Sequence, residues 1–339
     1  MEGLMGRSDK KKGTKKKKLK ILGFSILAII VIALAVGGYE YSQLQPANHF
    51  KKVPVVASGD ATKDANNQKV DSKLSNSAFN ILLLGSDERK GDSAGHSDSM
   101  MIVHLDLKKN EYHALSIPRD TRVHMDGYGY TKLTSVQYIT QSTKGKQAGV
   151  EAAVKAISEL TGIPINYYVE TNYWGLQGMV DAVGNVNVDV PFDVKLTHPW
   201  YKENKGKTIT AGTHSMDGKM VSELVHERYS LKNGEYGRQQ LQEAALKGIA
   251  KSALSPSNIT NLPSLANSIS DFLLATNMTK SDMASLGLAV KDIDLNSIQY
   301  HQLHGEGKTM YNDVLKANDS EIVLDPQEVK DIANKYFIN

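Results

Sequence analysis

Acidic and basic side chains gather at the predicted ends of several strands and helices, where open α/β sheets place their sites. The first cluster pairs Asp87, after one predicted strand, with Asp98, which lies just before the next predicted strand and is preceded by His96 and Ser97. Carboxylates at strand ends can hold a hard cation such as magnesium. Asp87 and Asp98 could equally be turn formers or helix caps.

The second cluster joins Arg119 and Asp120, at the end of a predicted strand, with Lys132 a short loop later. The guanidinium fork of Arg119 suits phosphate oxygens, and Lys132 adds a point charge. The alternative is an Arg-Asp pair that braces a loop.

The third cluster lies between two predicted helices, with His226 and Arg228 ending one and Glu235 opening the next. Arg238 and Gln242 are four residues apart and share one helix face, near a helix start that favours anions. The alternative is a capped helix with a solvated charged face. Taken together, the three clusters indicate a clamp for a diphosphate with a magnesium ion.

The elements that position these clusters alternate between strands and helices. Residues 79–85 are a continuous apolar run, typical of a strand buried on both faces. The further predicted strands are 100–107, 111–117, 166–171, 186–190 and 297–303, and the predicted helices are 147–162, 173–183, 216–228, 236–252, stretches of 260–290, and 326–336. This order predicts an α/β domain whose central sheet is mostly parallel or mixed, with helices on both faces.

Composition excludes several classes of protein. The chain of 339 residues has no cysteine, which rules out disulfides, thiolate metal sites and a cysteine nucleophile. It has no Walker loop, dinucleotide-binding glycine motif, serine nucleophile elbow or His-Glu-x-x-His zinc motif. The two tryptophans, Trp174 and Trp200, are interpreted as packing or surface residues rather than ligand contacts.

The first 39 residues predict a membrane anchor. Residues 1–20 hold nine Lys or Arg against two acidic residues, and residues 21–39 are 19 uncharged, mostly apolar residues. The positive tail predicts a cytoplasmic amino terminus and an external domain. A cleaved signal peptide ending near Ala33-Leu34-Ala35 is the alternative. Residues 40–77 are polar and are interpreted as an extracellular linker, followed by one domain over 78–339.

Over residues 78–252 the chain resembles the LytR-CpsA-Psr family of cell-wall phosphotransferases. The segments that carry the resemblance are NILLLGSDER (80–89), HSDSMMIV (96–103), SIPRDTRV (116–123), YTKLTSVQY (130–138), VDAVGNVNVDVP (180–191) and GEYGRQQLQ (234–242). The resemblance implies an external α/β domain with an apolar pocket for a polyprenyl chain. It also implies transfer of a lipid-linked glycopolymer, such as teichoic acid or capsule, to peptidoglycan, with release of polyprenyl phosphate.

The resemblance also assigns roles to residues. It implies magnesium, or manganese in its place, held by Asp98 and Glu235, with Asp87 nearby and either Asp87 or Asp98 deprotonating the acceptor hydroxyl. The implied pyrophosphate-binding residues are Arg119, Lys132, Arg228, Arg238, Gln242, His96 and His226. The implied partners are the lipid-linked polymer, peptidoglycan and membrane lipid. No nucleic acid is expected, because the basic charge is confined to the tail and the rest of the chain is mildly acidic.

Five positions depart from the family pattern. His96, His226 and Leu241 stand where the family has arginines, Glu235 replaces an aspartate, and Asn185 replaces a glycine. A weaker clamp, a different substrate, or activity that rises in mild acid as the histidines become charged would each fit. Two other functions are open: a weakened paralogue that binds lipid-linked polymer or assists an active relative, and a transcription regulator. About 20 cytoplasmic residues are too few for a DNA-binding fold, which disfavours the regulator.

Overall fold

The computed structural model of the chain describes residues 42–51, 53–57, 77–260 and 262–338. The predicted cytoplasmic tail 1–20 and membrane segment 21–39 lie outside these residues. Within the described ranges, no helix is both long enough and apolar enough to cross a membrane.

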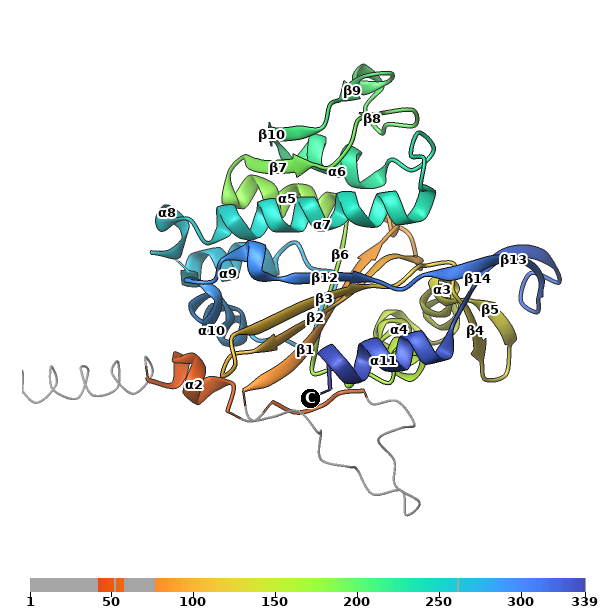
Figure 1. The fold of residues 1–339 in the computed structure, drawn as a ribbon, viewed down its shortest axis with the longest axis horizontal. Coiled ribbons are helices and arrows are strands. Elements are labelled where there is room, and N and C mark those ends of the chain that lie inside the picture. Colours follow the sequence, from red (N-terminus) through yellow and green to blue (C-terminus); the bar gives the residue numbers. More distant parts are fainter. Residues whose placement is uncertain (1–41, 52, 58–76, 261, 339) are drawn as a thin grey trace, which may run out of the picture.

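A six-stranded mixed sheet forms the centre of the domain (Figure 1). Its strands, in spatial order, are β11 (Ala275–Thr276), β6 (Tyr167–Asn172), β1 (Ala78–Ser86), β2 (Ser97–Asp106), β3 (Glu111–Ser116) and β12 (Gln299–Gln302). Only β1 with β6 and β3 with β12 pair in parallel, and the other three neighbours are antiparallel. The mixed sheet is confirmed, and a mostly parallel sheet is wrong. The reason is that β1, β2 and β3 follow one another through short loops, which allow only antiparallel pairing.

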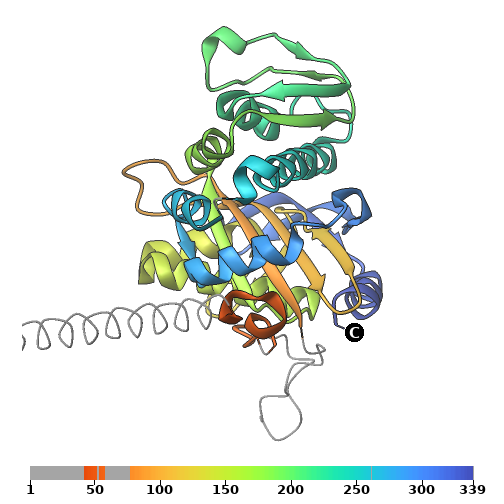
Figure 2. The same ribbon diagram turned by 90° about the vertical axis from the view of Figure 1, so that its left-hand side faces the viewer.

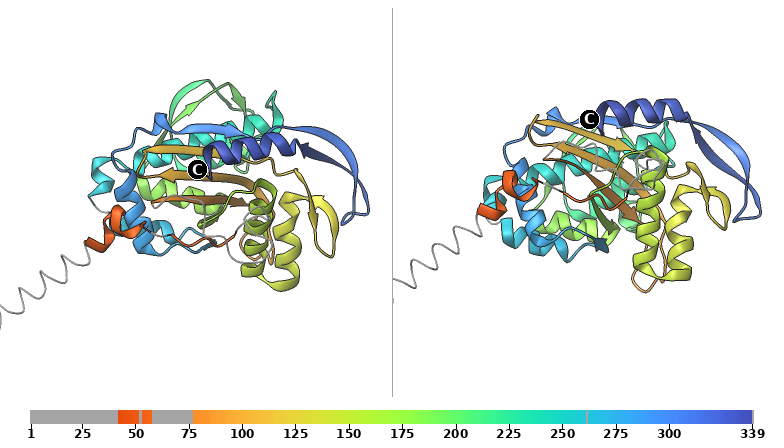
Figure 3. Two further views of the ribbon diagram at one scale, coloured as in Figure 1. Left: turned by 60° about the horizontal axis from the view of Figure 1, so that its bottom comes forward. Right: turned by 90° about the horizontal axis from the view of Figure 1, so that it is seen from below.

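Helices cover both faces of this sheet, as the sequence predicts. Alternate residues of β1 face opposite ways: Leu82 and Leu84 belong to one buried cluster, whereas Ile81 and Leu83 belong to another. One face carries α3 (Leu133–Lys144), α4 (Lys146–Thr161) and α11 (Pro326–Tyr336), seen from below in Figure 3. The other face carries α9 (Leu262–Ser270) and α10 (Lys280–Val290), which lie in front of the sheet in Figure 2.

A smaller lobe lies on the other side of the long helix α7 (Gly234–Ala253), at the top of Figure 1. It contains α5 (Tyr173–Val183), β7 (Val186–Val190), β8 (Val194–Lys195), β9 (Thr208–Ile209), β10 (Gly212–Met216) and α6 (Gly218–His226). The predicted strand 186–190 is confirmed, but it pairs with β10 and not with the central sheet. Its inward valines pack against α6 and α7 in a cluster of their own.

Two hairpins at one end of the sheet lie outside the predicted elements. They are β4 (Arg122–Met125) with β5 (Gly129–Lys132), and β13 (Gly305–Asn312) with β14 (Ala317–Leu324). An ion pair between Arg122 and the fully buried carboxylate of Glu321 joins them, and Thr121 bridges to Ile322. The hairpins therefore form one unit that extends to the right in Figure 1.

The described residues near the amino terminus, within the predicted linker 40–77, pack against the domain. Phe50, which follows helix α2 (Pro46–His49), is fully buried and stacks on Phe79 with ring centroids 4.6 Å apart. The ring of His49 contacts Asp282 of α10 at 2.7 Å, and Ala57 forms a β-bridge with Ile165. The start of the predicted linker is thus held to α10 and β1.

Candidate functional site

Two arginines meet at Asp98 on β2. Arg119, in the loop after β3, forms a charged hydrogen bond with the Asp98 carboxylate, and each side chain is 17% exposed. Arg238 enters from α7 and donates to the backbone carbonyl of Asp98 at 2.8 Å. Arg238 also pairs with Glu235, one turn earlier on the same helix, at 2.7 Å. The structure therefore brings four residues from all three sequence clusters into direct contact.

This arginine pair retains donors that no protein group uses. The Nε atoms of Arg119 and Arg238 are buried and have no hydrogen-bond partner. Burial alone would lower the pKa of Arg119, but the charges of Asp98 and Asp120 outweigh it and raise that pKa above its ordinary value. An unpaired buried donor is costly, so two of them on the arginines that meet at Asp98 favour an anionic ligand.

Asp87 and His96 form a second pair, at the two ends of the β1–β2 loop. The carboxylate of Asp87 accepts the His96 backbone N–H at 2.6 Å and lies 3.3 Å from its ring Nδ1. The other contact of the His96 ring is a stack on Tyr138, with centroids 4.4 Å apart. Burial raises the pKa of Asp87, but the hydrogen bonds and charge of His96 and the charge of Arg119 lower it further, so the net shift is downward. Asp87 is therefore ionised at neutral pH.

His226, at the end of α6, lies behind the clamp. Its Nδ1 is 3.3 Å from the hydroxyl of Tyr173. Burial, and then the charge of Arg238, lower the pKa of His226. Burial and the charge of Asp98 raise the pKa of Tyr173 to about 12, so its hydroxyl stays protonated. Charging His226 therefore requires stronger acid than its ordinary pKa of 6.5 implies, so mild acid charges this residue less than the sequence predicts.

Lys132 and Arg228 do not join the clamp directly. Lys132 contacts Asp120 at 3.4 Å and Asp319 at 2.9 Å, and Asp120 in turn lies 3.8 Å from Arg119 Nε. Arg228 donates to the hydroxyl of Tyr229 at 2.9 Å. The structure thus places Lys132 one residue away from the clamp and Arg228 beside an exposed tyrosine.

Gln242 lines a small hollow at the mouth of the site, with a volume of about 100 Å³, together with Asp98 and Tyr173. Its Oε1 accepts a hydrogen bond from the Ser99 hydroxyl at 3.0 Å. The neighbouring Leu241 is fully buried in the cluster of the smaller lobe. An arginine there would have to enter that core, so this departure from the family pattern removes no group from the mouth.

An apolar cavity of about 370 Å³ lies next to this hollow, between the sheet and helices α9 and α10. Leu83 of β1 lines both, and almost every other lining group of the cavity is aliphatic. The sequence does not single these residues out, because a helix that walls a cavity has the same apolar periodicity as one that packs in a core.

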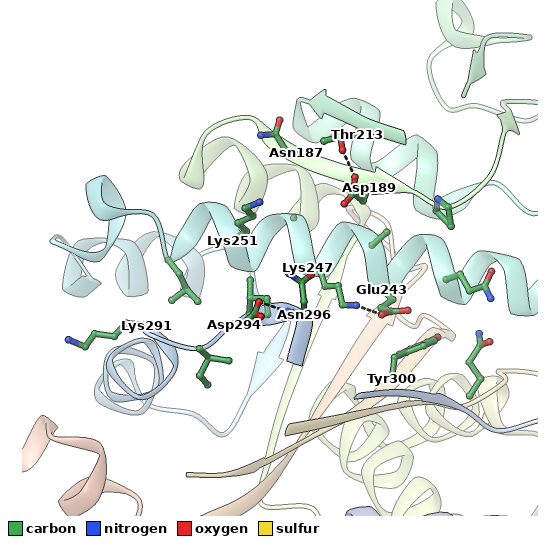
Figure 4. Close-up of a pocket in the computed structure, with 18 residues that line it drawn as sticks. Asn187, Asp189, Thr213, Glu243, Lys247, Lys251, Lys291, Asp294, Asn296 and Tyr300 are labelled. Atoms are coloured by element: carbon green, nitrogen blue, oxygen red, sulfur yellow. Dashed lines mark hydrogen bonds and ion pairs between the residues drawn. The ribbon is translucent and has the colours of Figure 1, made fainter. Parts of the chain in front are cut away.

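A larger, polar groove of about 730 Å³ runs along the opposite face of α7 (Figure 4). Glu243 and Lys247 of α7 form an ion pair at 2.6 Å on its wall, and Asp189 of β7 and Tyr300 of β12 face them. None of the residues predicted for the site lines this groove. Helix α7 therefore separates two hollows of different chemistry.

The acidic groups at the mouth suit a magnesium ion that arrives with phosphate. Arg238 contacts the carboxylate of Glu235 and the backbone carbonyl of Asp98, so both acidic residues lie beside one guanidinium. No group of three or more acidic or histidine residues that could hold a metal occurs in the described part of the chain. Mg²⁺ is commonly held by one or two carboxylates plus substrate phosphates and water, so this donor set fits.

Comparison with known proteins decides the family. The LytR_cpsA_psr family profile matches residues 49–335. The chain belongs to the LytR_cpsA_psr family. The match includes Phe50 and both hairpins, β4–β5 and β13–β14.

The curated relatives of this LytR_cpsA_psr protein carry the name polyisoprenyl-teichoic acid–peptidoglycan teichoic acid transferase TagU. The protein of Bacillus cereus strain AH820 is 32% identical over 294 residues, which cover 86% of this chain and 89% of that protein. The protein of Bacillus licheniformis is 27% identical over 329 residues, which cover 95% and 98%.

Solved structures share the fold. The structure of TagV from B. subtilis matches with a TM-score of 0.62 and 24% identity, covering 77% of this chain and 97% of that one. A structure described as TagT bound to LIIa-WTA matches with a TM-score of 0.60 and 26% identity, covering 76% and 89%. The mixed sheet with helices on both faces is therefore the architecture of this family.

Proposed function

We propose that this protein is a membrane-anchored phosphotransferase that moves a glycopolymer from polyprenyl pyrophosphate to a hydroxyl of peptidoglycan. The observation that carries the proposal is the arginine clamp at Asp98 beside an apolar cavity. A cationic clamp next to an apolar cavity suits a ligand with an anionic head and a hydrocarbon tail. The names of the curated relatives support teichoic acid or a related wall polymer as the cargo.

Binding exchanges partners within the clamp. The prenyl chain enters the apolar cavity, and each buried CH₂ contributes about 0.8 kcal/mol. The pyrophosphate oxygens take the donors of Arg119 and Arg238, including the two unused Nε atoms. Asp98 and Glu235 then lose their arginine partners, and their carboxylate oxygens would be free to hold Mg²⁺ or Mn²⁺. Gln242 contributes from the mouth, and Lys132, Arg228, His96 and His226 complete the proposed phosphate-binding set.

The reaction is a transfer of the glycan-bearing phosphoryl group. The acceptor hydroxyl oxygen forms a bond to the phosphorus nearer the glycan, and the bond from that phosphorus to the bridging oxygen breaks. Polyprenyl phosphate leaves with the electron pair, and Arg119 and Arg238 stabilise its charge. The hydroxyl proton passes to the carboxylate of Asp87 or Asp98. A bound divalent ion would neutralise charge on the phosphate oxygens.

The proposed location follows from the sequence. Residues 21–39 span the membrane, the basic tail 1–20 lies in the cytoplasm, and the folded domain lies outside the cell. The prenyl carrier, the domain and the wall acceptor then meet on one side of the membrane.

The test uses the full chain in detergent with a polyprenyl-pyrophosphate-linked glycan, and it measures released polyprenyl phosphate with and without Mg²⁺. Arg238→Ala and Arg119→Ala should each lower the rate about 100-fold, the typical effect of removing one charge-stabilising donor. The matched control is Lys155→Ala, which removes an exposed positive charge on α4. Melting temperatures show whether each variant is folded.

Three results would contradict the proposal. Full activity in both arginine variants would mean that the reaction does not take place at this clamp. Release of polyprenyl phosphate that does not depend on a divalent ion would exclude a role for Mg²⁺ or Mn²⁺ in the reaction. Binding of the lipid-linked glycan without any release by the wild type would favour the auxiliary paralogue.

A further inference from the structure

The only two tryptophans of the chain, Trp174 and Trp200, lie side by side on the surface. Trp174 is on α5, and Trp200 is in the segment between β8 and β9. Their ring centroids are 5.9 Å apart, and the ring planes meet at 57°. The two residues remain 45% and 37% exposed. We call these two residues the aromatic platform. A pair of exposed indoles is unusual on a folded surface, because each would gain free energy by burial.

The loop that carries Trp200 is fixed by buried carboxylates of α6 and the residue after it. Glu223, which is 1% exposed, accepts the backbone N–H groups of Trp200 at 2.9 Å and Tyr201 at 2.8 Å. Glu227 accepts the backbone N–H of Thr197 at 2.6 Å. Two buried acids therefore hold this loop in place, so the exposure of Trp200 is built into the fold.

The platform is continuous with the clamp. The ring of Trp200 packs against His226 with centroids 4.9 Å apart, and His226 contacts the Tyr173 hydroxyl. Tyr173 and Asp98 line the same hollow at the mouth of the site. A continuous row of aromatic rings, Tyr173, His226 and Trp200, therefore connects the hollow at Asp98 to the aromatic platform.

A pyranose ring is the ligand that this chemistry fits. One face of a pyranose presents C–H groups, which pack favourably against the electron-rich face of an indole. Its hydroxyl groups need polar partners nearby, and the guanidinium of Arg89, which stacks over the Trp200 ring 4.9 Å from the ring centroid, carries such donors. An aromatic face beside a cation is thus suited to a polar ring more than to a hydrocarbon chain.

We propose that Trp174 and Trp200 bind a sugar ring of the glycan substrate, next to the pyrophosphate clamp. This assignment rests on the proposed function for the place of the sugar in the reaction. Insertion of the tryptophans into a membrane is less consistent with the fold. The lobe with β8 and β9 is at the top of Figure 1, whereas α2, nearest the predicted membrane segment, is at the lower left.

The experiment measures the tryptophan fluorescence of the full chain. This emission comes from the aromatic platform alone, because the chain has no other tryptophan. The detergent should carry neither sugar nor aromatic groups. The probes are a short-chain prenyl pyrophosphate, the same compound bearing one N-acetylglucosamine, and a free N-acetylglucosamine tetrasaccharide. A separate arm adds phosphatidylglycerol vesicles. We expect the sugar-bearing donor or the tetrasaccharide to change the emission. Which of the two acts distinguishes a donor sugar from an acceptor sugar.

Trp200→Ala should weaken binding of the active probe about three- to tenfold, the range expected for one aromatic stack, with Trp174 still reporting. Trp200→Phe should retain part of the affinity, and Trp174→Ala provides a second test if the first variant does not fold. The control is Tyr128→Ala, which removes another exposed aromatic ring and should leave binding unchanged.

Equal binding of the prenyl pyrophosphate with and without its sugar, together with no response to the tetrasaccharide, would overturn the assignment. A response only to phosphatidylglycerol vesicles would replace it with a membrane contact. Failure of the proposed function is a separate result, since it would show as absent polyprenyl phosphate release in the wild type whatever the fluorescence.

Discussion

The carboxylate of Glu170 lies beneath the site and should make stability depend on pH. Glu170 is on β6 and is 2% exposed. The amide of Gln137 donates to it, and the Ser97 hydroxyl donates to the Oε1 of that same amide at 2.5 Å. This hydrogen-bonded chain connects the residue before Asp98 to the core.

Burial, together with the nearby charge of Glu88, raises the pKa of Glu170 to about 7, although the Gln137 hydrogen bond and Lys146 act in the other direction. The folded protein therefore binds this proton more tightly than the unfolded chain, whose pKa is near 4.5. Stability must then fall as the pH rises from about 4.5 to about 7. At about 1.4 kcal/mol per pKa unit, the difference amounts to about 3 kcal/mol.

Replacing Glu170 by glutamine keeps an acceptor for Gln137 and removes the titration. The free energy of unfolding should be similar for Glu170→Gln and wild type near pH 4.5, and it should be higher in the variant by up to about 3 kcal/mol at pH 8. Urea unfolding at the two pH values measures this difference. Glu151→Gln, at an exposed position of α4, is the control and should show no such dependence.

A stability difference between wild type and Glu170→Gln that is the same at pH 4.5 and pH 8 would refute this reasoning. It would mean that Glu170 has an ordinary pKa in the folded protein and is solvated or paired in solution.

Three other perturbations test separate parts of the structure. Phe50→Ala should lower the free energy of unfolding by about 3–5 kcal/mol, because the ring is fully buried; an unchanged urea midpoint would mean that the segment is undocked in solution. Arg122→Met should cost about 3–5 kcal/mol by leaving the Glu321 carboxylate buried without its partner. Adding Glu321→Gln should restore most of that loss, and a double variant no more stable than the single one would count against the pair. In an NMR titration, the ring of His226 should become protonated with a midpoint below pH 6.5, and a midpoint at or above that value would contradict the lowered pKa. The protein should also lose stability as the pH falls through the lowered pKa.

Much of the fold could be predicted where one residue pattern had one structural meaning. The apolar run 79–85 and the helix at 326–336 are both confirmed, since each has the period and the boundaries of its element. The hairpin of β13 and β14 escaped prediction because most of its β13 side chains are exposed and polar, which leaves no alternating apolar face.

The site shows a similar division. Asp98, Arg119 and Arg238 could be found because three charged clusters fall at element ends and match the family motifs, although each cluster alone could be a turn, a cap or an ion pair; the structure brings them together. The roles given to them remain predictions. The sequence predicts Trp174 and Trp200 as packing or surface residues rather than ligand contacts, and nothing in it shows that residues 26 positions apart lie side by side. That proximity comes from the contact of the α6 carboxylates with the β8–β9 segment, which is a tertiary effect.

The docking of the amino-terminal segment limits how far the protein can reach. Leu44 and His49 contact α10 through Ser285 and Asp282, and α10 also walls the apolar cavity. If residues 21–39 cross the membrane, almost no spacer separates the bilayer from the folded domain. The prenyl chain could then slide from the bilayer into the cavity over a short path, without crossing open water. The acceptor strand, in turn, would have to be one that passes close to the membrane, which restricts this protein to the innermost, newest layer of the wall.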